Sequence, residues 1–377
     1  MSELMQGRRI GSDFRWRLLT TVSAAVLAAG VYGAEEAHAN GDVDRPTVWL
    51  ELGAQLEGGG AAQEPVSPPF VINNLDRAYN VVSPLDAQRP PRFAFGGEGS
   101  ISIAPKNSDW VFTAAVRYGR SNGNKRLHQQ TSTKIKQHVG VPGTNKYRTF
   151  YHTITHFNDM QTAYHEAHTV LDFKAGKDVG LGMLGGHSTS NFGFGIRYAQ
   201  FSSKSTAVFR SLPDQYYPSN AFNVNLLHHH SYYARADIKR SFRGLGPSIS
   251  WTGSAPIIGN PDTTEISLDW AANAAALFGR QKVTGAHQTT GIFYTGSYNA
   301  KVKSGYHHPV PVNRSHSAIV PNVGGLAGIS FRRSNAKVSF GYRADFFFGA
   351  MDAGVDARHT ENVNFHGPFA TISIGLP

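Results

Sequence analysis

Apolar and polar residues alternate along the C-terminal part of the chain. Between residues 337 and 350 one parity is apolar, namely Val338, Phe340, Tyr342, Ala344, Phe346 and Phe348. The alternation returns at the end of the chain, in Ala370, Ile372, Ile374 and Leu376. Successive side chains of a strand point to opposite faces, so both segments are predicted to be amphipathic strands. An amphipathic strand that closes the chain is typical of a transmembrane β-barrel, which must seal its sheet.

The same period of two predicts ten strands in all, and a further hairpin around residues 292–302 would make twelve. The ten predicted strands are 47–57, 93–103, 110–118, 163–175, 189–201, 232–255, 265–279, 322–332, 337–350 and 367–376.

The strand at 232–255 changes its apolar parity between Ile238 and Leu245. We interpret it as one bent strand with a bulge near Arg243 and Gly244, because an inserted residue reverses the facing and glycine tolerates the kink.

This interpretation makes the connections alternate between short and long. The short ones are 104–109, 176–188, 256–263 and 333–336, and the long ones are 58–91, 121–162, 202–230, 281–317 and 351–365. Short periplasmic turns and long extracellular loops are typical of outer-membrane barrels. The predicted fold class is therefore all-β: an antiparallel up-and-down transmembrane β-barrel over residues 40–377.

Residues 1–39 have the features of a cleavable signal peptide. Arg8, Arg9, Arg15 and Arg17 precede a mostly apolar run, and Ala37-His38-Ala39 fits the cleavage pattern. The run is too short for a membrane-spanning helix, and no later segment reaches the length that one needs. We expect export to the cell outer membrane of a Gram-negative cell.

Composition supports a barrel. The chain has 40 Gly, 23 Phe and 15 Tyr, and only 40% of its residues are hydrophobic. This low apolar content fits a barrel better than a bundle of membrane helices, because alternation halves the apolar content of each strand. A secreted β-sandwich is the alternative, but the mature chain would be large for one core. The net charge is +10, but nucleic-acid binding needs more than basic charge and the sequence contains no recognition motif. We therefore expect no nucleic-acid partner.

The polar parity collects charged residues that would face the lumen. The pore-lining candidates are Glu98, Arg117, Asp172, Lys174, Arg197, Asp269, Arg343 and Asp345, and Glu51, Asp237 and Lys239 are assigned to the same parity. In an open barrel such residues select ions. In a narrow barrel they pair and fill the interior, and ten to twelve strands fall between these cases.

Two other kinds of site are weaker hypotheses. The histidines at 228–230 could capture zinc outside the cell, although no metal-binding spacing is present. Asp159, His165, Glu166 and His168 could form a hydrolytic site at the rim, although no nucleophile motif accompanies them. We therefore expect no enzyme activity, no metal site and no cofactor.

Several strands resemble the Legionella-type major outer membrane protein family. The similar segments are G-G-E-G-S-I-S at 96–102, L-D-F-K-A-G at 171–176, F-G-I-R-Y-A-Q-F at 194–201, F-R-G-L-G-P-S-I-S at 242–250, and the tail from Tyr342 through Asp352 to G-P-F-A-T-I-S-I-G-L at 367–376. Two departures are the absence of cysteine and the ending Leu376-Pro377 in place of a terminal aromatic residue.

The resemblance implies a porin-like role, passive passage of small hydrophilic solutes or ions. The alternatives are a non-conducting structural or adhesion barrel and, less favoured, the rim hydrolase. The expected partners are outer-membrane lipid and lipopolysaccharide, the permeating solutes or ions, and the barrel-assembly machinery. The sequence shows no subunit interface.

Overall fold

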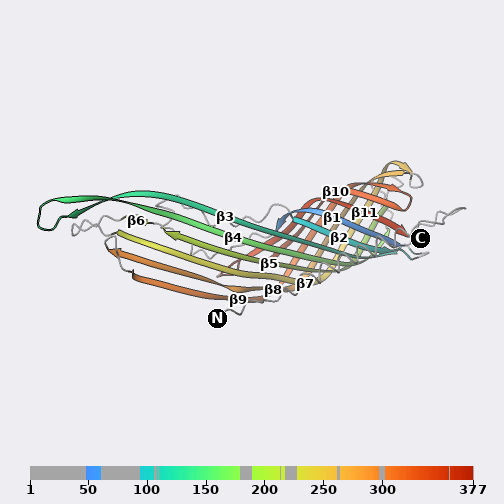
Figure 1. Ribbon diagram of the computed structural model, residues 1–377. Helices are drawn as coiled ribbons and strands as arrows, with labels where there is room; N and C mark the ends of the chain where they lie inside the picture. The colour runs from blue at the N-terminus through green and yellow to red at the C-terminus, as the bar shows by residue number, and fades with distance from the viewer. Residues whose placement is uncertain are drawn as a thin grey trace, which may run out of the picture.

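The computed structural model describes residues 48–60, 94–105, 108, 110–178, 189–212, 214–216, 227–260, 264–296, 302–355 and 357–376 (Figure 1). The predicted signal peptide lies outside these residues, so it stays a prediction.

The described chain consists almost entirely of antiparallel strands. They are β1 (Val48–Gly60), β2 (Ala94–Ile103), β3 (Trp110–Gly140), β4 (Tyr147–Asp178), β5 (Thr189–Leu212), β6 (Asp214–Tyr216), β7 (Leu227–Asn260), β8 (Thr264–Gly296), β9 (Val302–Arg333), β10 (Ala336–Asp352) and β11 (Thr360–Leu376). Among the described residues no helix is long and apolar enough to cross a membrane.

Ten of these strands close into a barrel, as predicted. Each strand pairs with its neighbours in chain order, β1 pairs with β11, and β5 pairs with β7. The short β6 adds to β7 outside this ring. Both β8 and β9 continue through the described part of 292–302, so the structure gives no separate hairpin there.

The two ends of the barrel differ. Val48 pairs with Leu376, so the first and last described strands meet at the end that carries the short turns, which we call the turn end. At the opposite, extended end, β3, β4, β5, β7, β8 and β9 continue far beyond the other strands as a curved sheet (Figure 1).

This extension corrects three predicted loops. Much of 121–162, 202–230 and 281–317 continues the strands on either side, in unbroken register between β3 and β4 from Trp110–Lys177 to Gly140–Tyr147. Apolar alternation is needed only where one face is buried or meets lipid. In these segments the buried apolar side chains, such as Phe209, Val283 and Val312, lie on the inward face, opposite to the apolar face of the barrel strands, so the outward apolar pattern did not extend the predicted strands into them.

The proposed bulge in β7 is also wrong. The register with β5 is unbroken from Thr189–Ser254 to Ser211–Tyr232, and the irregularity with β8 lies farther along, between Pro256 and Ile258. Ile238 is buried and faces inward, whereas Leu245 faces outward and is 52% exposed. Along β7 the apolar side chains change from the inward to the outward face, while the strand itself continues without a change of register.

The reason is a second core above the barrel. On the concave face of the extended sheet, apolar side chains pack into one cluster, comprising Met160, Ala207, Phe209, Ala234, Ala236, Ile238, Val283, Val312 and Val355. Consequently Asp237 and Lys239 face outward, contrary to the prediction that they face the lumen.

Around the barrel proper, the outward face is an apolar band. Its exposed members come from every strand of the ring and include Leu52, Phe95, Ile101, Phe112, Phe173, Phe194, Ile196, Leu245, Ile249, Leu268, Phe278, Ile319, Ile329, Phe340, Phe348 and Ile372. A water-soluble protein rarely exposes a continuous apolar surface of this kind.

Single-cysteine labelling tests the facing in β7, because the chain has no cysteine of its own. We expect Lys239→Cys in the folded protein to react rapidly with a water-soluble maleimide and Ile238→Cys to react slowly, since Lys239 is exposed and Ile238 is buried. A bulge near Arg243 would reverse the two rates.

Candidate functional site

All eight predicted pore-lining residues lie on the lumen side of the barrel. They come from six strands: Glu98 from β2, Arg117 from β3, Asp172 and Lys174 from β4, Arg197 from β5, Asp269 from β8, and Arg343 and Asp345 from β10. The inward direction of these side chains follows from their odd or even position along each strand, which can be read from the sequence. The pairing of these charges depends on the closed ring.

Arg197 is the centre of the charged layer. Its Nε and Nη2 donate to Asp172 Oδ1 and Oδ2 at 2.7 and 3.0 Å, and its Nη1 donates to Asn273 Oδ1 at 2.6 Å and also to Asn322. The guanidinium therefore joins β5 to β4, β8 and β9. Its side chain is only 1% exposed, so the lumen is filled at this level.

Further ion pairs cross the lumen between strands. Arg117 donates to Asp345, Arg343 donates to Glu98, and Lys337 Nζ lies 2.6 Å from Asp269 Oδ2. Lys174 Nζ lies 4.0 Å from Asp172 Oδ2. Each of the eight residues is thus paired with a residue of opposite charge, and together with Lys337, Asn273 and Asn322, which were not predicted, they make up the charged layer.

Exposure to water decreases along this layer from the turn end. The side chains of Lys337 and Lys174 are 28% and 23% exposed, whereas those of Arg197 and Asp345 are 1% and 2% exposed. Water therefore reaches the first ion pairs from the turn end and is excluded at Arg197.

An apolar layer follows the charged layer toward the extended end. Its fully or almost fully buried members are Val170, Ala199, Phe201, Phe242, Leu277, Val320, Phe347, Ala350, Met351 and Val363. The rings of Phe201 and Phe347 meet at 4.7 Å between centroids, and those of Phe201 and Phe242 stack at 5.9 Å. In this conformation the apolar layer closes the lumen to hydrated solutes.

The connection between β10 and β11 folds over the apolar layer. Arg314 of β9 donates to both Asp352 carboxylate oxygens, at 3.1 and 3.2 Å, and to the carbonyls of Gly354 and Val355 at 2.9 and 2.5 Å. Arg240 of β7 donates to the Ala353 carbonyl at 2.8 Å. These two arginines hold the connection in place.

The sequence pattern gives no sign of this contact. Arg314 and Asp352 lie in predicted loops, and the predicted bulge was near Arg243 and Gly244. Only the long strands β9 and β7 bring Arg314 to the Asp352 carboxylate and Arg240 to the neighbouring Ala353 carbonyl.

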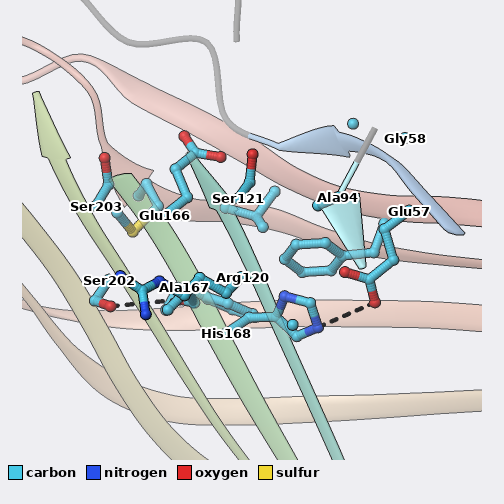
Figure 2. A pocket seen from close by; sticks show the side chains of 16 residues that line it. Glu57, Gly58, Ala94, Arg120, Ser121, Glu166, Ala167, His168, Ser202 and Ser203 are labelled. Carbon is cyan, nitrogen blue, oxygen red and sulfur yellow. Dashed lines mark hydrogen bonds and ion pairs between the residues drawn. The ribbon is translucent and has the colours of Figure 1, made fainter. Parts of the chain in front are cut away.

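A small cavity of about 40 Å³ lies beside the apolar layer, lined by Glu57, Glu166 and His168 among others (Figure 2). His168 Nε2 is 3.3 Å from Glu57 Oε1, and the imidazole packs against Phe365 at 3.9 Å between centroids. A Cβ at Gly119 would lie 2.1 Å from the His168 ring and 2.3 Å from Glu57. Glycine at this position makes room for the buried pair. The cavity has room for a few water molecules.

Glu166 lies on the extended side of the last large apolar outward residues of β4, Leu171 and Phe173. Burial raises the pKa of its carboxyl group from the ordinary 4.5 to about 7, and the nearby charge of Arg240 opposes that rise. Glu166 therefore changes its charge near neutral pH.

The four residues of the hypothetical rim hydrolase are not brought together. His165 faces outward and contacts Asn122, whereas Glu166 and His168 face inward. Asp159 pairs with His128. The side chains of the histidines at 228–230 are not among those that the structure describes, so the zinc hypothesis stays a prediction.

No protein-family model matches this chain, and no curated protein matches it. Solved structures similar in fold include the transport unit of the autotransporter AIDA-I from Escherichia coli, with 7% identity over 94% of this chain and 98% of that one and a TM-score of 0.23. A bacterial polysaccharide outer membrane secretin shares 8% identity over 89% of this chain and 100% of that one, with a TM-score of 0.19.

A deletion mutant of TodX, a monoaromatic hydrocarbon channel, also shares 8% identity, over 89% of this chain and 94% of that one, with a TM-score of 0.19. These likenesses are too low to carry an argument about function.

Removal of one partner of the central pair should be costly. We expect Arg197→Ala to lower the free energy of unfolding by about 3–5 kcal/mol, because it leaves the buried carboxylate of Asp172 without its bidentate partner. Urea unfolding in detergent micelles measures this. The control is the double variant D172A/R197A, which removes both charges and should be more stable than R197A alone. A double variant that is less stable than R197A would contradict the assigned pairing.

Glu166 should make stability depend on pH. The carboxyl pKa is higher in the folded chain than in the unfolded chain, so its contribution to stability is fully present below pH 4.5 and is lost as the pH rises to about 7. Glu166→Gln stays neutral at every pH. Relative to wild type, we expect this variant to gain stability across the same window, measured by urea unfolding.

Parallel stability curves for wild type and E166Q through this window would contradict the assignment.

Proposed function

We propose that this protein is an outer-membrane β-barrel with a porin-like function, the passive passage of small hydrophilic solutes or ions. The placement in the cell outer membrane is supported by the closed ring of strands and by the apolar band outside it. In hydrocarbon only a closed sheet satisfies the backbone groups of its strands. In this orientation the turn end is periplasmic and the extended end is extracellular.

The observation that carries the pore proposal is the layer of charged side chains inside the lumen. Buried ion pairs stabilise a protein no better than well-packed apolar residues of similar volume, so stability alone does not account for them. A layer that bridges six strands and is reached by water from the turn end fits a permeation path. Side chains of both signs would then set the ion preference.

Passage requires a conformational change, because the apolar layer closes the lumen in this conformation. The connection held by Arg314 and Arg240 covers the apolar layer, and their side chains anchor it through Asp352, Ala353, Gly354 and Val355. Because these contacts can be released without opening the ring of strands, this connection is the part best placed to move. Its release would uncover the aromatic side chains beneath. The proposed protein is therefore a pore with a closed resting state.

The resemblance of several strands to the Legionella-type major outer membrane protein family also supports a pore-forming role. A second candidate function is a sealed barrel that serves only to present the extended sheet outside the cell. The specific observation in its favour is the complete burial of Phe242 and Phe347, both 0% exposed, in the apolar layer.

Planar bilayers distinguish the two candidates. We expect purified wild-type protein to give discrete conductance steps with long closed periods, and Arg314→Ala to increase the open fraction, because it removes the donor that holds Asp352 and the two carbonyls. Arg126→Ala, on the exposed distal part of β3, is the control and should behave as wild type.

Arg117→Ala should shift the reversal potential toward cation preference, because it removes a positive charge from the lumen. Folded wild-type and Arg314→Ala proteins that both remain silent would overturn the pore and leave the sealed barrel.

A further inference from the structure

Five cations gather on the outer face of three neighbouring strands just above the apolar band. They form a surface that we call the basic patch: Lys204 of β5, Lys239 and Arg243 of β7, and Arg280 and Lys282 of β8. All five are exposed. None of them lines the lumen, so the proposed pore does not use them.

The register places these cations side by side. Lys204 is directly opposite Lys239, and Arg243 is directly opposite Arg280. Lys282 is opposite Ser241, which lies between Lys239 and Arg243 along β7. Like charges directly opposite each other on neighbouring strands destabilise a sheet. Two such pairs together therefore indicate that an anion is present between them when the protein is in its own environment.

The described outward residues near the patch offer a single acid, Asp237, for its five cations, and it interacts with Lys204. From Tyr198 to Arg210 on β5, and from Phe278 to Thr284 on β8, the outward positions hold no Asp or Glu. The nearest outward carboxylate is Asp237 on β7. It is bound by Arg235 at 2.8 Å and by the Thr206 hydroxyl at 2.9 Å.

The position of the patch identifies the source of the anion. Tyr198, Leu245, Phe278 and Ile319 lie in one row across β5, β7, β8 and β9, at the edge of the apolar band. The next outward row already contains Arg243 and Arg280. The patch thus begins where lipid tails end and head groups start.

We propose that the basic patch binds phosphate groups of lipopolysaccharide in the outer leaflet. This inference rests on the outer-membrane placement proposed above, and not on conduction. Guanidinium groups bind phosphate oxygens in a bidentate manner, and lysine adds a compact charge. The patch extends for about 13 Å along β7, since a strand rises by about 3.3 Å per residue. It therefore has room for more than one phosphate on a single glycolipid.

A freely diffusing anionic solute fits the geometry less well. A site that attracts solutes toward a pore would face the lumen or its mouth, whereas these five side chains point away from it. The apolar row beneath the patch adds a surface for acyl chains, which a small solute does not have. Phosphate and acyl groups joined in one molecule satisfy both surfaces.

The test uses the full mature chain in nanodiscs of zwitterionic phosphatidylcholine, titrated with bisphosphorylated lipid A and followed by native mass spectrometry. We expect K239S/R243S/R280S/K282S to bind lipid A about tenfold more weakly than wild type. The matched control R126S/K134S/K146S/R148S removes the same charge from exposed positions on the distal part of β3 and β4 and in the turn that joins them, and it should bind within about twofold of wild type.

Further arms distinguish the sources of the anion. Dephosphorylated lipid A should bind wild type as weakly as lipid A binds the patch variant, and millimolar inorganic phosphate should not displace lipid A. Equal binding by the patch and control variants would overturn the proposal. Full displacement by inorganic phosphate would overturn the lipid as the occupant and indicate a free-anion site.

The outcome is separable from the proposed function. Conductance steps from a protein that does not bind lipid A would overturn the lipid site alone. Failure of the folded protein to float with phosphatidylcholine vesicles would overturn the membrane placement on which both proposals rest.

Discussion

Closure of the sheet is the constraint on which the rest of the structure depends. Each backbone N–H and C=O of a strand surrounded by hydrocarbon needs a partner on a neighbouring strand, and an open edge has none. The β1–β11 and β5–β7 pairings supply the last of these partners. Closing the ring also fixes how much space the inward side chains must fill, because the diameter of a barrel follows from its strand number.

In a ring of ten strands that space is small enough for side chains to meet across it. Arg197 on β5 contacts Asn273 on β8 and Asn322 on β9, and Arg343 on β10 contacts Glu98 on β2. Each charge is compensated by an opposite one or by an amide. The same crowding accounts for the closed lumen, since the apolar layer lies directly above the charged one. A pore built this way would be controlled by small movements of a few side chains and of the connection held by Arg314.

The extended half of the wall reverses the usual arrangement of a barrel. Within the apolar band the outward side chains are apolar and the inward ones are polar. Above it, Ile238 and its neighbours pack inside while Lys239 and Arg243 point outward. The change follows the surroundings, because a side chain that meets lipid and one that meets water need opposite chemistry. The basic patch and the second core are two consequences of this one reversal.

The sequence by itself determined the class of fold, the number of strands in the ring and the inward facing of the eight lumen charges. All three follow from the two-residue period, which is a local property of a strand in lipid. It did not determine where the strands end or how β7 keeps its parity, because beyond the apolar band the apolar side chains change from the outward to the inward face.

Only the tertiary structure decided which charges pair, since partners such as Arg343 and Glu98 lie far apart in the chain and meet through closure alone. It also brought Arg314 to Asp352 and placed Lys239 beside Lys204. These contacts depend on the register between strands, and a repeating pattern of apolar and polar residues is compatible with many registers.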